Sequence, residues 1–287
     1  MNKTKKAIRD LVADIDVVLE LLDARAPLSS CNPLLQYLIK YKKKIRLLNK
    51  ADLADNKLTM KWIKYFAKKD GSIAIAGNKD NLRQKNQLIT LCQSLAPNRK
   101  SFEKPLRVMI IGIPNVGKST LINKLVGKKS AKTGDIPAVT KANQCLTLTD
   151  SFLIYDTPGM MWQKIQYEQI GNNLALCNSI GRRALDEESL AFYLLNYLKV
   201  HYGEYLISRY KLTEAMLQLT DVELINIIGK KRGSLFSGGI IDVQKVSEII
   251  IQDFREGRIG KITLESPELW EKWIDEAKNE EEPNEDE

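Results

Sequence analysis

The segment from Gly112 to Ser119 constrains this chain most, because it reads G-x-x-x-x-G-K-S between a strand pattern and a helix pattern. The apolar run Leu106–Ile111 precedes it, and the periodic segment Thr120–Leu125 comes after it. Such a glycine-bounded loop points backbone N–H groups and a helix N-terminus at an anion. Lys118 would reach the outer phosphates, and the Ser119 hydroxyl would bind Mg²⁺. The sequence therefore predicts a nucleoside triphosphate site formed by Asn115, Val116, Gly117, Lys118, Ser119 and Thr120.

A second motif, N-K-x-D at residues 49–52, predicts which base is bound. Guanine presents an N2 amino donor and an O6 acceptor that adenine lacks. The Asp52 carboxylate can accept from the ring N–H and the amino group together, Asn49 can bond the other edge, and the Lys50 stem can cover the ring face. Adenine would leave that carboxylate unpaired in a desolvated site. We therefore expect GTP or GDP as the ligand.

Two further segments complete the predicted site. Asp156-Thr157-Pro158-Gly159 comes after the strand pattern Phe152–Tyr155, so that Asp156 would hold Mg²⁺ through water and the Gly159 N–H would contact the γ-phosphate. The polar segment 130–141 is typical of a switch, with Thr140 contacting Mg²⁺ and the γ-phosphate. The expected metal residues are therefore Ser119, Thr140 and Asp156, and the expected catalytic residues are Lys118, Thr140 and Gly159.

One base-contacting segment carries a weaker signal. It should come after the strand pattern Ser72–Ala76, which places it at Ala76 and Gly77. A plain turn before Asn78 explains these two residues almost as well, so both interpretations stay open.

The order of the motifs is unusual, since N-K-x-D precedes the phosphate loop by more than sixty residues. That order is typical of circularly permuted GTPases, and the chain most resembles the bacterial ribosome biogenesis GTPase A family. The resemblance implies a GTP-hydrolysing assembly factor for the large ribosomal subunit that binds rRNA in a nucleotide-dependent way. We also expect a protein that is monomeric off the ribosome and, because no run of eighteen apolar residues occurs, cytoplasmic rather than located in an organelle matrix. Further matching segments are Asp23-Ala24-Arg25-Ala26-Pro27, Ser29–Pro33, Lys132–Asp135, Lys230–Gly233 and Ser237–Gly239.

Alternating strand and helix patterns predict an α/β fold, a P-loop GTPase domain with a mostly parallel sheet and helices on both faces. The nucleotide would lie at the carboxyl ends of the strands. Helical patterns come next, so we expect a GTPase domain over residues 1–165 and a smaller, helical RNA-binding domain over 166–272. Residues 273–287 are acidic and are expected to be a disordered tail.

Charge supports a polyanionic partner. Residues 275–287 carry a net charge of −7, and the whole chain has +8, so that residues 1–274 carry +15. Each basic cluster alone is typical of a solvated helix face, and only their total favours RNA. Four scattered cysteines and one histidine make a zinc site or a disulfide framework a poor interpretation, and no apolar run is long enough for a membrane span.

The catalytic residues depart from the pattern of ordinary GTPases. Met160 stands where those enzymes have a glutamine that orients the attacking water. In the resembled family the proposed substitute is an N-terminal histidine. Met1–Lys5 matches the family's residues directly after that histidine, so we expect weak intrinsic hydrolysis from this sequence. Asn115 is typical of GTPases that bind K⁺ beside the phosphates, although a loop asparagine also simply favours a turn.

Two other functions fit part of the pattern. One is a metabolic P-loop enzyme that transfers phosphate to a small molecule. The N-K-x-D motif argues against this function, because such an enzyme does not need it. The other is a nucleotide-gated binding module with little hydrolysis.

Asp23 and Arg25, at a strand end, are expected to form an ordinary structural ion pair.

Overall fold

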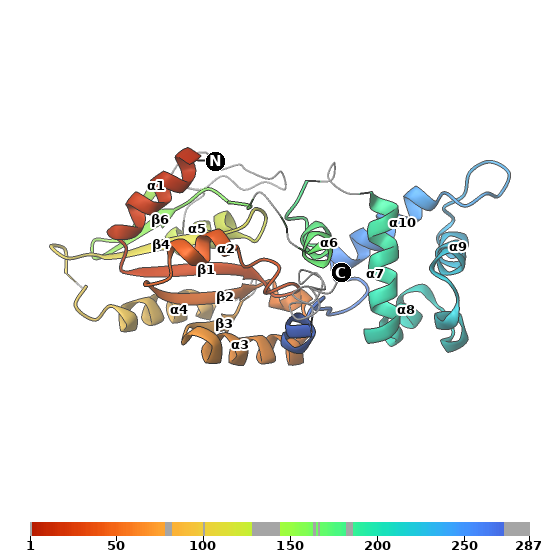
Figure 1. Cartoon of the computed structure of the whole chain (residues 1–287), viewed down its shortest axis with the longest axis horizontal. Coiled ribbons are helices and arrows are strands. Elements are labelled where there is room, and N and C mark those ends of the chain that lie inside the picture. The colour runs from red at the N-terminus through yellow and green to blue at the C-terminus, as the bar shows by residue number, and fades with distance from the viewer. Residues whose placement is uncertain are drawn as a thin grey trace, which may run out of the picture.

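A six-stranded sheet forms one half of the molecule, with the strand order β3-β2-β1-β4-β6-β5 (Figure 1). The computed structural model describes residues 2–77, 82–99, 101–127, 144–162, 165, 167–181 and 186–272. Thr140, the segment 130–141 and the acidic tail 273–287 lie outside these residues. The strands are β1 (Val17–Asp23), β2 (Lys43–Asn49), β3 (Ile73–Ala76), β4 (Leu106–Gly112), β5 (Gln144–Thr149) and β6 (Phe152–Asp156).

Only β5 runs antiparallel to its neighbour, β6, so the prediction of a mostly parallel sheet is confirmed. β1 lies in the middle of the sheet and is buried along its whole length. A strand covered on both faces has a nearly continuous apolar sequence, as VVLELLD does, and the buried Glu20 in its middle forms an ion pair with Arg46 of β2 at 3.0 Å.

Helices cover both faces of the sheet. α3 (Asn56–Asp70), α4 (Leu82–Leu95) and α5 (Lys118–Val126) pack on the face that carries Leu19 and Ile110. α1 (Asn2–Ala13) and α2 (Pro33–Leu38) cover the opposite face, around Met109. The sequence patterns did not indicate α1.

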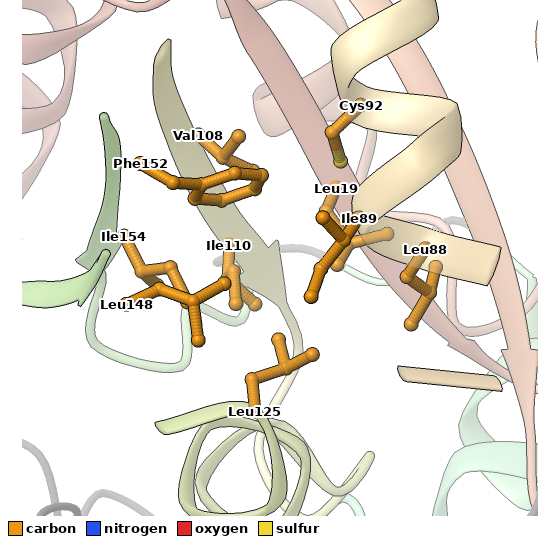
Figure 2. A pocket seen from close by; sticks show the side chains of 10 residues that line it. All are labelled: Leu19, Leu88, Ile89, Cys92, Val108, Ile110, Leu125, Leu148, Phe152 and Ile154. Carbon is orange, nitrogen blue, oxygen red and sulfur yellow. The ribbon is translucent and has the colours of Figure 1, made fainter. Parts of the chain in front are cut away.

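The core under α4 and α5 leaves one small gap (Figure 2). Its volume is about 10 Å³, room for no more than one water molecule, and its walls are apolar. The gap is therefore a packing defect and no ligand site. Its lining residues are Leu19, Leu88, Ile89, Cys92, Val108, Ile110, Leu125, Leu148, Phe152 and Ile154.

Polar side chains cap the first turns of several helices. The Asn32 side chain caps α2, with Pro33 as its first residue, and Asp186 caps α7 (Glu187–His201). Thr220 and Glu223 form a capping box at the start of α9 (Asp221–Arg232), and Asp242 caps α10 (Val243–Arg255). These signals are local, because each depends on a side chain and a backbone N–H two or three residues later.

The helical part of the molecule comprises α6 (Glu168–Leu176), α7, α8 (Gly203–Tyr210), α9 and α10, and lies beside the sheet (Figure 1). It has a hydrophobic core of its own, but α6 contributes to both cores: Ile170 and Leu174 pack with the sheet, and Leu176 packs with the other helices. After α10 the chain returns to the sheet, and the Trp270 ring packs into the sheet's core. Among the described residues, no helix is both long and apolar enough to cross a membrane.

Candidate nucleotide site

Three predicted loops meet at one edge of the sheet, because β2, β4 and β6 are parallel and their carboxyl ends point the same way. Asn49 is the last residue of β2, the phosphate loop comes after β4, and Asp156 is the last residue of β6. The Asn49 amide donates to the Val116 carbonyl oxygen at 2.7 Å. The N-K-x-D segment and the phosphate loop, which are far apart in the sequence, are thus joined directly.

The phosphate loop needs its second glycine. Gly117 has a φ of 101°, in the left-handed region, and a Cβ there would lie 2.3 Å from the Asn49 amide nitrogen. The buried Lys118 side chain folds back over the loop, and its Nζ donates to the Gly112 carbonyl at 3.1 Å and the Ile113 carbonyl at 3.4 Å. Burial lowers the pKa of Lys118 to about 8, and the nearby charge of Asp156 opposes that shift. An anion beside Lys118 would restore the charged form.

Asp156 is a buried carboxylate that no donor satisfies. It is 1 % exposed, and neither of its oxygens accepts a hydrogen bond from the part of the chain that the structure describes. Burial raises the pKa of Asp156, and the charge of Lys118 only partly opposes the rise. An unsatisfied buried carboxylate is costly unless it is paired with a cation, so this residue fits a Mg²⁺ site.

Gly159 lies directly against the phosphate loop. A Cβ at this position would be 3.1 Å from both the Lys118 Nζ and the Pro114 backbone. The turn is held by Thr157, whose hydroxyl donates to the Ile110 carbonyl at 2.9 Å. The backbone of Gly159 is therefore close to the place that an outer phosphate would occupy beside Lys118.

The N-K-x-D turn and the Ala76–Gly77 segment are neighbours. The Gly77 N–H donates to the Leu48 carbonyl, and the Gly77 carbonyl accepts from the Ala51 N–H, both at 2.9 Å. A Cβ on Gly77 would lie 2.1 Å from the Gln84 amide nitrogen of α4 and 2.5 Å from the Leu47 Cδ1 atom of β2, so a side chain at this position would force both neighbours to move. Asp52 lies in a short 3-10 turn, Ala51–Leu53, and its side chain is exposed.

Two polar contacts of the site were not predicted. The Lys50 ammonium lies 2.8 Å from the Asp23 carboxylate, which also binds the Arg25 guanidinium. The Asn115 amide donates to the Asn178 carbonyl at 2.7 Å, from the phosphate loop to the residues after α6. The spacing of Asp23 and Arg25 indicated their own ion pair, but no local pattern indicates Lys50 or Asn178 as a partner.

Met160 is buried in the core formed with α1 and α2. Its carbonyl accepts a hydrogen bond of 2.8 Å from the Asn32 amide. The side chain at the water-orienting position is therefore a packing residue, and it has no group that could orient water.

Family models match both parts of the chain. The model described as RsgA GTPase matches residues 1–166, and the model described as 50S ribosome-binding GTPase matches residues 107–229.

Close relatives extend over nearly the full length. Ribosome biogenesis GTPase A of Bacillus cereus is 40 % identical, over 98 % of this chain and 97 % of the relative. The protein of the same name from Thermotoga maritima is 31 % identical, over 93 % of this chain and 92 % of the relative. Among solved structures, GNP-bound YlqF from T. maritima superposes with a TM-score of 0.64 and 28 % identity, and covers 93 % of this chain and 99 % of that chain.

Proposed function

This chain belongs to the ribosome biogenesis GTPase A family, and we propose that its GTPase cycle controls a step in the assembly of the large ribosomal subunit. Its relatives carry that name, and one family model is described as a 50S ribosome-binding GTPase. The single observation that carries the proposal is the hydrogen bond between Asn49 and Val116, because it joins a guanine-recognition motif to a phosphate loop in one site.

We assign the nucleotide contacts by residue. Asp52 and Asn49 recognise the guanine edge, the Lys50 stem covers its face, and the Ala76–Gly77 backbone bounds it. The phosphate loop from Asn115 to Thr120 holds the phosphates through its backbone N–H groups. This assignment is supported by the contact of Gly77 with both Leu48 and Ala51.

Ser119 and Asp156 would hold Mg²⁺, with Thr140 as a further ligand. The metal supplies charge neutralisation for the phosphates. The protonated Lys118 ammonium donates to the outer phosphates, and the Gly159 N–H contacts the γ-phosphate. Because Met160 cannot orient water, we propose that the water-orienting group comes from another segment or from the ribosomal partner.

The basic body of the protein supports rRNA as the partner. A cavity of about 770 Å³ is lined by basic residues, Lys40, Lys42, Lys43, Lys44 and Lys69 among them, and by aromatic residues that include Trp162 and Tyr167. Lysines attract the RNA backbone, and aromatic rings stack on unpaired bases. RNA binding should therefore weaken steeply as salt rises.

The Asp52→Asn variant tests the guanine assignment. We expect the wild-type chain to bind GDP far more tightly than ADP in calorimetry. An amide at position 52 loses the double acceptor, so guanine affinity should fall by about a hundredfold, and xanthosine diphosphate, which carries an oxygen in place of the N2 amino group, should bind better than GDP. Equal binding of ADP and GDP by the wild type would contradict the proposed function.

A turnover assay tests the biological role. We expect large ribosomal subunits to accelerate phosphate release from GTP, and small subunits to have no effect. Phosphorylation of a small molecule would instead support a metabolic enzyme, and no turnover in any condition would support a binding module.

Replacing K⁺ by Na⁺ in this assay tests a K⁺ role for Asn115. Sedimentation of the free protein tests the predicted monomer. A cytoplasmic location is part of the proposed role.

A further inference from the structure

Lys50 is fixed at both its backbone and its ammonium group. Its φ is 59°, a left-handed conformation that a lysine adopts only under constraint. Its ammonium lies 2.8 Å from the Asp23 Oδ2 atom, and its side chain is 17 % exposed. A lysine side chain is ordinarily flexible, but these two attachments hold the Lys50 side chain in one orientation over the proposed base site.

The Asp23 carboxylate is itself held in one orientation. It is fully buried, and its Oδ1 accepts from the Arg25 backbone N–H at 3.0 Å and from Nε at 2.9 Å. Its Oδ2 accepts from the Arg25 Nη2 at 2.8 Å and from Lys50. Such a two-pronged guanidinium–carboxylate pair fixes the plane of the carboxylate, which leaves one direction for the lysine.

Arg25 also binds the end of α10. Its Nη1 donates to the carbonyl of Arg255, the last residue of α10, at 3.3 Å, and its guanidinium lies 5.3 Å from the centre of the Phe254 ring. Carbonyls at a helix C-terminus lack partners within the helix and form the negative end of its dipole. The same guanidinium therefore contacts the helical part and the carboxylate that holds Lys50.

The contacts continue to the phosphate loop. The Arg255 side chain donates to the carbonyls of Ala175, at 2.8 Å, and Leu176, at 3.1 Å, which close α6. Two residues beyond α6, the Asn178 carbonyl accepts from Asn115. Both nucleotide loops are thus connected to the same pair of helix ends.

We propose that Asp23 and Arg25 are positioning residues for guanine nucleotide binding, which hold Lys50 over the base only while α10 is docked on Arg25. The inference rests on the proposed role of Lys50 at the guanine ring. A partner that displaces α10 from Arg25 would weaken the hold of Lys50 on the guanosine half of the nucleotide. Binding of a partner to the helical part would then change the affinity of the protein for the nucleotide.

The test compares two ligands by calorimetry: GDP, and inorganic pyrophosphate, which needs only the phosphate loop. Arg25→Lys keeps the charge but loses the two-pronged pair and the reach to Arg255. Lys50→Met keeps the apolar stem and removes the anchored ammonium. Each substitution should weaken GDP binding about fivefold to tenfold, because a long side chain that is no longer held in place must be immobilised when GDP binds. Pyrophosphate binding should not change. The double variant should bind GDP no more weakly than Lys50→Met alone.

Arg209→Lys is the matched control. Arg209 forms the same kind of two-pronged pair with Asp253, a buried residue of α10, at 2.9 and 2.8 Å. Within the described part of the chain, its guanidinium forms no hydrogen bond or ion pair with either nucleotide loop. This variant should leave both affinities unchanged. Should Arg25→Lys not fold, Phe254→Leu probes the same contact from α10 with every charge retained, and it should weaken GDP binding alone.

Three results would overturn the inference: unchanged GDP affinity in Arg25→Lys, equal losses for GDP and pyrophosphate, or additive losses in the double variant. If Arg25→Lys does not fold, unchanged GDP affinity in Phe254→Leu has the same meaning. A wild-type chain that binds pyrophosphate but not GDP would refute the proposed function instead.

Discussion

At the scale of single residues, the proposed phosphate site depends on two buried side chains that can carry charge. Lys118 and Asp156 are both buried, and they influence each other's pKa without forming a direct ion pair in the described structure. Burial favours the neutral form of each: it lowers the pKa of the lysine and raises the pKa of the carboxyl group. A magnesium nucleotide would supply an anion for the first and a cation for the second, so ligand binding relieves both penalties.

Nucleotide affinity should depend on pH through Lys118. Its pKa is about 8 in the folded chain, and its ordinary value is 10.5. Phosphate binds the protonated lysine, so the affinity for GDP should fall above about pH 8, by up to about tenfold per pH unit. Calorimetry between pH 7 and pH 9 measures this fall. Lys118→Arg stays charged throughout, and a fall of equal size in that variant would assign the effect to another group.

The stability of the protein without nucleotide should change in the opposite direction. Between about pH 8 and 10.5 the unfolded chain keeps the Lys118 proton that the folded chain has released. Stability rises with pH wherever the unfolded state binds more protons, so this lysine makes the folded state more stable as pH increases through that window.

At the scale of elements, the segment after α10 binds the helical part to the sheet. The Ile262 and Leu264 N–H groups donate to the carbonyls of Leu53, at 3.1 Å, and Arg25, at 2.7 Å. The fully buried Glu265 carboxylate accepts from the backbone N–H groups of Leu28 and Ser29, the Ser29 hydroxyl and the Asn173 amide. This segment thus adds no strand, but it satisfies polar groups at the carboxyl edge of the sheet.

Glu265→Gln should destabilise the protein by about 1–3 kcal/mol, because each carboxylate oxygen accepts two hydrogen bonds and an amide N–H₂ in either place could accept neither of them. Urea denaturation monitored by circular dichroism measures the loss. Glu268→Gln is the control three residues later: its ion pair with Lys61 is exposed, and surface pairs contribute about 1 kcal/mol or less. Equal stabilities of the two variants would show that the buried contacts of Glu265 contribute nothing specific.

At the scale of the whole molecule, the core that contains Trp62 and Ile110 in the sheet half and the core of the helical part are linked by shared elements. α6 contributes side chains to both, and Trp270 packs into the core of the sheet after the chain has passed through the helical part. The Trp270 ring also meets Tyr167 edge to face, with ring centres 6.1 Å apart. Because of this interlocking, we expect the sheet and the helical part to unfold together.

Trp270→Ala tests this expectation. Removing a buried tryptophan should lower the free energy of unfolding by about 3–5 kcal/mol. We expect faster amide exchange both in α3, which packs on the sheet, and in α6 of the helical part. Hydrogen exchange with mass spectrometry resolves the two regions. If exchange in α3 were unchanged, Trp270 would be only a local contact of the helical part.

Much of the fold could be predicted because its signals are short-range. The cap of α2 by Asn32 and the capping box of α9 each involve residues within three positions of one another, and the phosphate loop is one continuous segment. The meeting of β2, β4 and β6 could also be predicted, since the carboxyl ends of parallel strands share one edge.

The amino-acid sequence by itself determined the kind of ligand and the parts of its site, because anion cradles and base recognition depend on residue types at fixed local spacing. Only the tertiary structure decided which side chains hold those parts. Lys50 meets Asp23 across 27 positions, and Arg25 meets Arg255 across 230. Contacts over such separations arise from strand order and helix docking, which are set by the burial of whole faces and leave no pattern around either residue.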